Sequence, residues 1–191
     1  MESPHLHSQL EPTVAPVLPE SLDELVHFCE LHGRHGHGKF AWCVCMGWRM
    51  PASELQESTP VMRQDALYGL VGDGVPVGVI AAVDGEPIGW CSVAPRHTYR
   101  ALERSRSIRR LDGVDVWSVV CFFVDPPLRR QRITRRLLEG ALAYAASCGA
   151  AVVERYPVEP GTRSYAYMGA PSGTSRRSDP CASWMRAAKT R

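Results

Sequence analysis

VWSVVCFFVDPPLRRQRITRRLLEGALAYAASCGAAVVERYP, residues 116–157, is the stretch from which the rest of the fold can be worked out. Its first part, Val116–Val124, is apolar and rich in β-branched and aromatic side chains, which is typical of a strand buried on both faces. Apolar residues then recur at helical spacing up to Gly149, a residue type that often ends helices. These helical positions are Ile133, Leu137, Leu138, Ala141, Leu142 and Ala145. A second short apolar run begins at Ala150–Val153, so the order predicts a right-handed parallel strand–helix–strand crossover.

The loop between the first strand and the helix is a predicted anion site. The first amides of a helix have no internal partners and lie at the positive end of the helix dipole, so they bind phosphate readily. Positive charge is added at the same corner by Arg129, Arg130, Arg132, Arg135 and Arg136. We therefore expect a polyphosphate ligand there. The alternative is a solvated basic helix start on a purely structural unit.

Length and composition restrict the class of protein. The chain has 191 residues, of which 45% are hydrophobic and 22% charged, enough for one globular domain with a full core. A net charge of only +2 argues against a general nucleic-acid binder. No apolar stretch approaches the roughly 20 residues needed to span a bilayer, and no secretory signal is recognised. Seven cysteines, an odd number, fit a reducing compartment, so a cytoplasmic location is expected.

Three regions are expected along the chain. Residues 1–19 carry four prolines with little apolar periodicity and are predicted to be a disordered arm. Residues 20–172 are predicted to form the domain, with Ser21–Glu24 as the capping box of its first helix. Residues 173–191 have no apolar period of either kind and are expected to be a polar, basic and disordered tail.

Further elements are predicted between these ends. A short helix is expected over Val61–Val71, ended by the glycines that follow it. Val77–Val83 and Ile88–Val93 are joined by an Asp-Gly turn and should form an antiparallel hairpin. Residues 95–111 carry six arginines and are interpreted as a solvated connector, or as an amphipathic helix beside a cleft.

A His- and Cys-rich segment lies near the N-terminus. It contains His27, Cys29, His32, His35, His37, Cys43 and Cys45. Histidine and thiolate are zinc ligands, but the spacing matches no standard zinc module, so no metal site is predicted. The favoured interpretation is a buried strand over 40–46, whose cysteines act as small apolar residues, after an exposed Gly/His loop.

Three segments together resemble the GNAT acetyltransferase superfamily over Leu22–Met168. They are the hairpin GVIAAVDGEPIGWCSVAPR, the strand WSVVCFFV and the segment VDPPLRRQRITRRLLEGALAYAASCGA. More narrowly, WCVCMGWR, GWCSVAPR and VVERYPVE look like an uncharacterised bacterial subgroup. The resemblance implies an α/β (α+β) fold: a mixed, mostly antiparallel twisted sheet with a central parallel βαβ unit flanked by helices. That sheet would be splayed between its parallel strands, with acetyl-CoA lying in the opening.

The resemblance also implies a function and binding residues. Acetyl-CoA would be the co-substrate, and an amine would attack its thioester directly. The pantetheine arm would lie against Phe122, Phe123 and Val124, and the pyrophosphate against Arg129, Arg130, Gln131, Arg132, Ile133, Thr134 and Arg135. One alternative is a catalytically inactive GNAT-fold binding or regulatory protein, and another is a nucleic-acid or zinc-binding module. No membrane or nucleic-acid partner is expected, and a homodimer is left open.

The chain departs from the family pattern at two places. Arg132 and Thr134 stand where the turn of the family has glycine, or glycine or alanine, and the family-like pattern ends near Ser172. No catalytic residue is assigned. The candidates near the expected site are Cys91, Ser118, Glu154, Tyr156, Tyr165 and Tyr167, and none has a pattern that distinguishes it.

Overall fold

A computed structural model describes residues 11–34, 45–105, 108 and 114–156. Within these residues the chain forms a five-stranded sheet in the order β1-β2-β3-β4-β5. The strands are β1 Thr13–Pro16, β2 Val79–Val83, β3 Glu86–Pro95, β4 Val116–Val124 and β5 Val152–Arg155. The first four are antiparallel to their neighbours and β5 is parallel to β4. The predicted mixed, mostly antiparallel sheet with a parallel βαβ unit is therefore confirmed.

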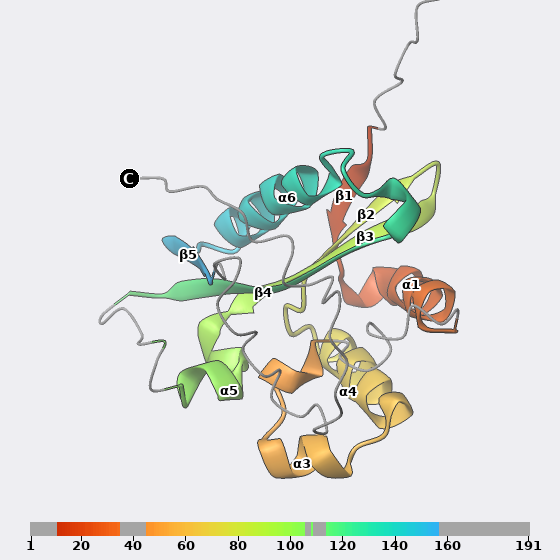
Figure 1. Ribbon diagram of the computed structural model, residues 1–191. Helices are drawn as coiled ribbons and strands as arrows, with labels where there is room; N and C mark the ends of the chain where they lie inside the picture. Colours follow the sequence, from red (N-terminus) through yellow and green to blue (C-terminus); the bar gives the residue numbers. More distant parts are fainter. Residues whose placement is uncertain (1–10, 35–44, 106–107, 109–113, 157–191) are drawn as a thin grey trace, which may run out of the picture.

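Helices cover both faces of the sheet (Figure 1). The helix α6, Ile133–Ser147, lies on one face, and the other helices of the described residues lie on the opposite face. These helices are α1 Leu22–Arg34, α3 Ala52–Glu57, α4 Pro60–Gly72 and α5 Arg100–Glu103. Short 3-10 turns are η1 Pro19–Ser21, η2 Met46–Trp48, η3 Arg96–Thr98 and η4 Pro126–Leu128. None of the helices described is both long and apolar enough to cross a bilayer.

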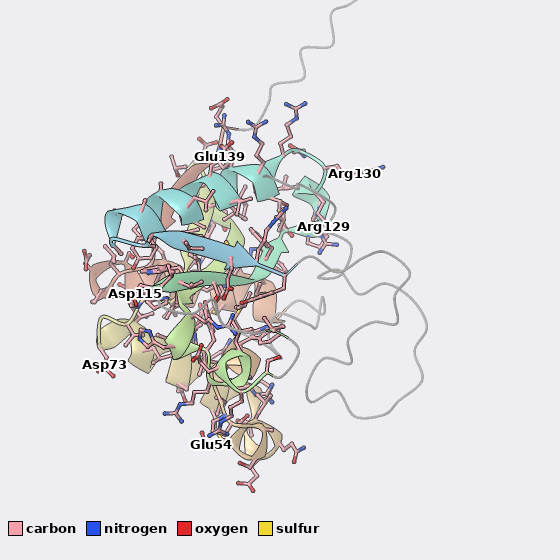
Figure 2. The ribbon with its side chains drawn as sticks, turned by 90° about the vertical axis from the view of Figure 1, so that its left-hand side faces the viewer. Glu54, Asp73, Asp115, Arg129, Arg130 and Glu139 are labelled. Carbon is pink, nitrogen blue, oxygen red and sulfur yellow. The ribbon has the colours of Figure 1, made fainter. Side chains whose placement is uncertain are left out.

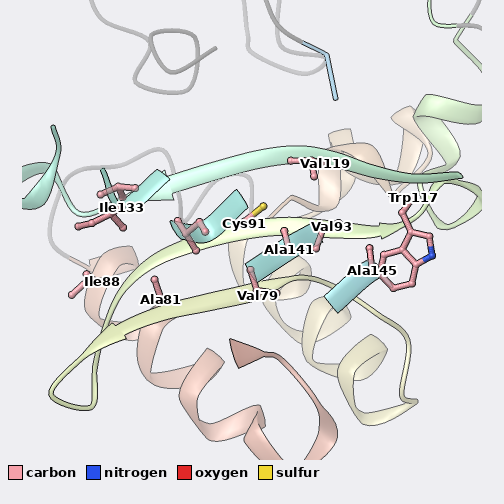
Figure 3. Close-up of a cluster of buried hydrophobic side chains, with 12 residues drawn as sticks. Val79, Ala81, Ile88, Cys91, Val93, Trp117, Val119, Ile133, Ala141 and Ala145 are labelled. Atoms are coloured by element: carbon pink, nitrogen blue, oxygen red, sulfur yellow. The ribbon is translucent and has the colours of Figure 1, made fainter. Parts of the chain in front are cut away.

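The core under α6 follows from the spacing of its apolar residues. Its buried residues are Ile133, Leu137, Ala141 and Ala145, each four positions from the next and therefore on one side of the helix. Figure 3 shows Ile133, Ala141 and Ala145 against β2, β3 and β4. The helix α6 also packs closely against β1, because a Cβ added at Gly140 would lie 2.3 Å from Val14 Cγ1 on β1.

The second core lies between the sheet and the helices α1 and α4. Its fully buried large side chains include Leu25, Phe28, Leu67 and Trp90. The indole Nε1 of Trp90 donates a hydrogen bond to Cys45 Sγ at 3.2 Å, so the polar atom of this buried ring has a partner.

Local turn chemistry sets the β2–β3 hairpin. Asp84 and Gly85 both have positive φ, 52° and 82°, which is the backbone of a type I′ turn and is favoured by Asp-Gly. The predicted hairpin is confirmed, as are the helix around 61–71 and the strand over 116–124.

The expected disordered arm is wrong in its second half. Thr13–Pro16 form β1, an edge strand that pairs with β2, and Val14 packs under α6. Prolines are tolerated there because an edge strand needs the amides of only one side. Residues 1–10 and 157–191, which include the expected tail, lie outside the described residues.

Candidate active site

The strand β4 is paired with the parallel strand β5 over only part of its own length. Their pairs run from Val116–Val152 to Val119–Arg155. Beyond that point β4 continues to Val124, while β5 has ended. The pairing therefore ends at Val119–Arg155 while β4 continues, and we call this point the strand separation.

A bulge in β4 coincides with this separation. In the pairing with β3, Val119 is opposite Val93 and Cys121 is opposite Ser92, so Val120 is the extra residue. A bulge redirects the strand and its side chains, and bulges are common beside active sites. Past the bulge, Cys121 and Phe123 pack toward the core of α1 and α4, whereas Phe122 packs toward α6. The residues predicted to contact the pantetheine arm, Phe122–Val124, therefore lie on β4 beyond its last pair with β5.

The loop that follows β4 turns the chain into α6. It begins with η4, and then Arg129 Nε donates a hydrogen bond to the carbonyl of Val124 at 3.1 Å, which holds the loop against the strand end. Arg130 and Arg132 have φ of 71° and 62°, in the left-handed region. Arg132 is the N-cap of α6, and its carbonyl accepts from the amides of Arg135 and Arg136.

This geometry fits a phosphate group. The amides of Ile133 and Thr134 open α6, where an α-helix has no carbonyls of its own to offer them. Arg132 adopts a backbone conformation that glycine adopts more easily, so the turn keeps the shape expected for glycine although the residue is arginine. The amides and the helix dipole are then directed at the same point.

Only part of the arginine cluster is neutralised by described carboxylates. Glu139 accepts from Arg135 at 2.8 Å and lies 3.6 Å from Arg136, which also contacts Glu11. The hydrogen bond from Arg135, with the charges of both arginines, lowers the pKa of Glu139. Arg130 and Arg132 are exposed, and Figure 2 shows Arg130 with Arg129 at the N-terminal end of α6. Positive charge is therefore left at the turn.

A buried polar cluster lies beside the strand separation, on the face opposite α6. Its centre is Arg96, which is 2% exposed and bonds to the Glu154 carboxylate and, at 2.6 Å, to the Tyr156 hydroxyl. Ser118 Oγ donates to the same Glu154 oxygen at 2.7 Å. The Arg96 Nε also donates to Glu103 at 2.9 Å.

The pKa values in this cluster follow from those contacts. Burial raises the pKa of Glu154, but hydrogen bonds from Tyr156, Arg96 and Ser118 outweigh it, and the net pKa is lowered. Burial first, and then the hydrogen bond to Glu154, raise the pKa of Tyr156. Glu154 is therefore held as an anion and Tyr156 as a neutral phenol.

A second buried group lies under the bulge. The Tyr99 hydroxyl is 3.0 Å from Ser92 Oγ, and Ser92 is the residue opposite Cys121. The guanidinium of Arg49 lies 4.4 Å from the centre of the Tyr99 ring and donates to Thr98 Oγ1 at 3.0 Å. The side chains of Tyr99, Ser92 and Arg49 therefore pack next to the bulge in β4.

The candidate catalytic residues have different positions. Ser118, Glu154 and Tyr156 come together beside the separation, as described above. Cys91 is fully buried in the core under α6, and this burial raises the pKa of its thiol well above the usual value. Tyr165 and Tyr167 lie outside the described residues. Arg96 was missed because it is one of six arginines in a segment interpreted as a solvated connector. No signal in the sequence identifies the buried one.

The described residues of the His/Cys segment do not come together around one point that could hold a metal ion. Burial raises the pKa of the Cys29 thiol to about 11, and Cys45 accepts from Trp90. His27 lies 3.3 Å from Glu86, and His32 lies 3.0 Å from the carbonyl of Pro87. Within the described ranges no group of three potential metal ligands forms. His35, His37, Cys43 and most of the expected strand over 40–46 lie outside those ranges.

Comparison with known proteins identifies the family of the chain from its sequence. No curated protein sequence is significantly similar to the chain. Among solved structures, the GCN5-related N-acetyltransferase from Ralstonia eutropha JMP134 is 23% identical, with 90% of this chain and 99% of that chain covered and a TM-score of 0.46. The aminoglycoside N-acetyltransferase AAC(6')-Iy in complex with CoA is 14% identical, with 78% of each chain covered and a TM-score of 0.47. The sequence model of the acetyltransferase (GNAT) family matches residues 42–168, more than half of the chain, and the chain therefore belongs to this family.

Proposed function

We propose that this protein is an N-acetyltransferase that moves an acetyl group from acetyl-CoA to an amine. The observation that carries the proposal is the extension of β4 beyond its last pair with β5, Val119–Arg155, and on into the basic turn before α6. Family membership supports acetyl-CoA as the donor. The pantetheine arm would lie along Phe122–Val124 and the pyrophosphate at residues 129–135.

The reaction is a direct transfer. The amine nitrogen attacks the thioester carbonyl carbon, a C–N bond forms, and the C–S bond breaks. The sulfur leaves as a thiolate and takes up a proton, while the new amide nitrogen loses one. Holding the two reactants at the strand separation would supply much of the rate by proximity.

The Arg96, Glu154, Ser118 and Tyr156 group offers no strong general base. Glu154 is the carboxylate of the cluster beside the separation, but its lowered pKa makes it a weak proton acceptor. We propose that the amine proton leaves through water.

The location of the protein is proposed from the state of its cysteines. We place the protein in the cytoplasm, supported by the five described cysteines, which are all free thiols.

A catalytically inactive binding protein is the second candidate function. The observation that favours it is the Arg132 side chain, which stands at a turn position typical of glycine.

Calorimetry with acetyl-CoA tests the proposal. The double variant Arg130→Ala/Arg132→Ala is compared with Arg100→Ala/Arg104→Ala, which removes the same charge from exposed sites on the other face. Two charge-assisted contacts at about 1.5 kcal/mol each predict roughly 100-fold weaker binding for the first variant only. Measuring the free thiol of CoA that is released when acetyl-CoA and a panel of amines are added then distinguishes an active enzyme from an inactive binding protein. Failure of the unmodified protein to bind acetyl-CoA would refute the proposal.

A further inference from the structure

The side chain of Arg96 is saturated with partners although it is buried. Its Nε donates to Glu103, and its Nη1 donates to Glu154 and Tyr156. Its Nη2 donates to the carbonyls of Leu102 at 3.3 Å and Ile108 at 2.8 Å. A guanidinium has five N–H groups, so every donor of Arg96 is used.

These bonds join the segments that meet at the strand separation. Glu154 is on β5 and shares one oxygen between Arg96 and Ser118, which is its pairing partner on β4. This pair stands one position before Val119–Arg155, the last pair of the two strands. The Arg96 cluster, defined as Arg96, Glu103, Ser118, Glu154 and Tyr156, therefore fixes β5 to β4 at the point where they part.

The cluster also reaches past that point. Tyr156 follows β5, and its hydroxyl is held by Arg96, while its ring packs in the same group of side chains as Val120. Val120 is the bulge residue of β4. The position of the Tyr156 ring in this group of side chains therefore depends on a hydrogen bond from Arg96.

A purely stabilising role accounts poorly for this arrangement. Removing charges from water costs about as much free energy as a buried ion pair returns, so such pairs add little net stability. A planar fork with every donor fixed does, however, define one arrangement of the segments that it joins. The chemistry of Arg96 therefore suits positioning.

We propose that Arg96, acting through Glu154 and Tyr156, is a positioning residue that fixes the end of β5 and the Tyr156 ring beside β4, where the acyl-pantetheine end of acetyl-CoA would bind. The inference rests on the proposed function, because it needs acetyl-CoA as the ligand. It predicts that Arg96 controls the affinity for the acyl-pantetheine part and has no effect on the nucleotide part, which would bind at the turn before α6.

Calorimetry with two ligands tests this division. One ligand is acetyl-CoA and the other is 3′-phosphoadenosine 5′-diphosphate, which is the nucleotide half without the pantetheine arm. Arg96→Met should weaken acetyl-CoA binding at least tenfold and change nucleotide binding less than twofold. Arg96→Lys should give an intermediate loss, because one ammonium cannot serve all five acceptors. Arg63→Met is the matched control, since Arg63 is also buried but bonds to Ser58 between α3 and α4.

The outcomes separate the inference from the proposed function. Equal weakening of both ligands in folded Arg96→Met, or no weakening of either, would overturn the positioning role. If neither Arg96 variant folds, Tyr156→Phe decides, because it removes only the hydroxyl held by Arg96. It should weaken acetyl-CoA selectively, and an unchanged ratio of the two affinities would overturn the inference. Lack of binding of both ligands by the unmodified protein would instead refute the proposed function.

Discussion

Arg132 should destabilise the protein through its backbone, and replacing it with glycine should therefore raise stability. Its φ of 62° lies in the left-handed region, which costs a non-glycine residue about 1–2 kcal/mol. Glycine loses more entropy on folding, at a cost of about 0.5–1 kcal/mol. The side chain of Arg132 is exposed and forms no N-cap hydrogen bond, so little is lost with it. The expected net gain of Arg132→Gly is about 0.5–1 kcal/mol, which corresponds to a rise in Tm of about 1–4 °C.

Urea and thermal unfolding measure this gain, and Arg135→Gly is its control. Arg135 is an exposed arginine three residues further on, inside α6, and it pairs with Glu139. Glycine in this first turn of α6 costs up to about 1 kcal/mol, and loss of the pair adds a few tenths. The same change of residue should thus act with opposite sign at the two positions. Destabilisation of both variants by a similar amount would refute the left-handed conformation at Arg132.

Four further results are expected. Gly140→Ala should destabilise by about 1–3 kcal/mol, because its Cβ would lie 2.3 Å from Val14 Cγ1, and Val14→Ala in the same chain should recover part of the loss in urea unfolding. Leu137→Ala should cost about 2–5 kcal/mol, since Leu137 is fully buried under α6; a smaller loss would contradict that packing. The pKa of Glu154 is lowered in the folded state, so its contribution to stability is present above the ordinary carboxyl pKa and is lost as the pH falls through the folded pKa. Glu154→Gln should therefore reduce the fall of unfolding free energy between about pH 5 and pH 3. With two accepted amines of different basicity, the pH profile of kcat/KM should follow the pKa of each amine, and one shared pKa would indicate an enzyme base instead.

Local patterns in the sequence were sufficient to predict the elements of the βαβ unit. Val116–Val124 has a continuous apolar run and α6 has a clear helical period, so both were predicted close to their observed bounds. The Asp84-Gly85 turn was predicted because few residue pairs adopt its backbone easily. The edge strand β1 was not predicted, since Thr13–Pro16 becomes a strand only through β2 and α6, which come much later in the chain.

The candidate site also has one part that the sequence predicts and one part that it does not. Its turn is encoded by consecutive residues and was predicted, although the left-handed backbone of Arg130 and Arg132 was not. The Arg96 cluster combines residues 96, 103, 118, 154 and 156, and no spacing rule connects them. Charge in a basic segment predicts solvent exposure for each arginine equally, so only the fold determines which one is buried.

The Arg96 cluster also affects the proton path of the proposed reaction. A carboxylate can be an effective base near neutral pH only when its pKa is raised, as by burial without partners. Glu154 is partly buried, which raises its pKa, but Arg96, Ser118 and Tyr156 all donate to it, and the net pKa is lowered. A carboxylate held this firmly is suited to fixing β5 and poorly suited to accepting a proton. Positioning and base catalysis therefore place opposite demands on Glu154, and its hydrogen bonds favour positioning.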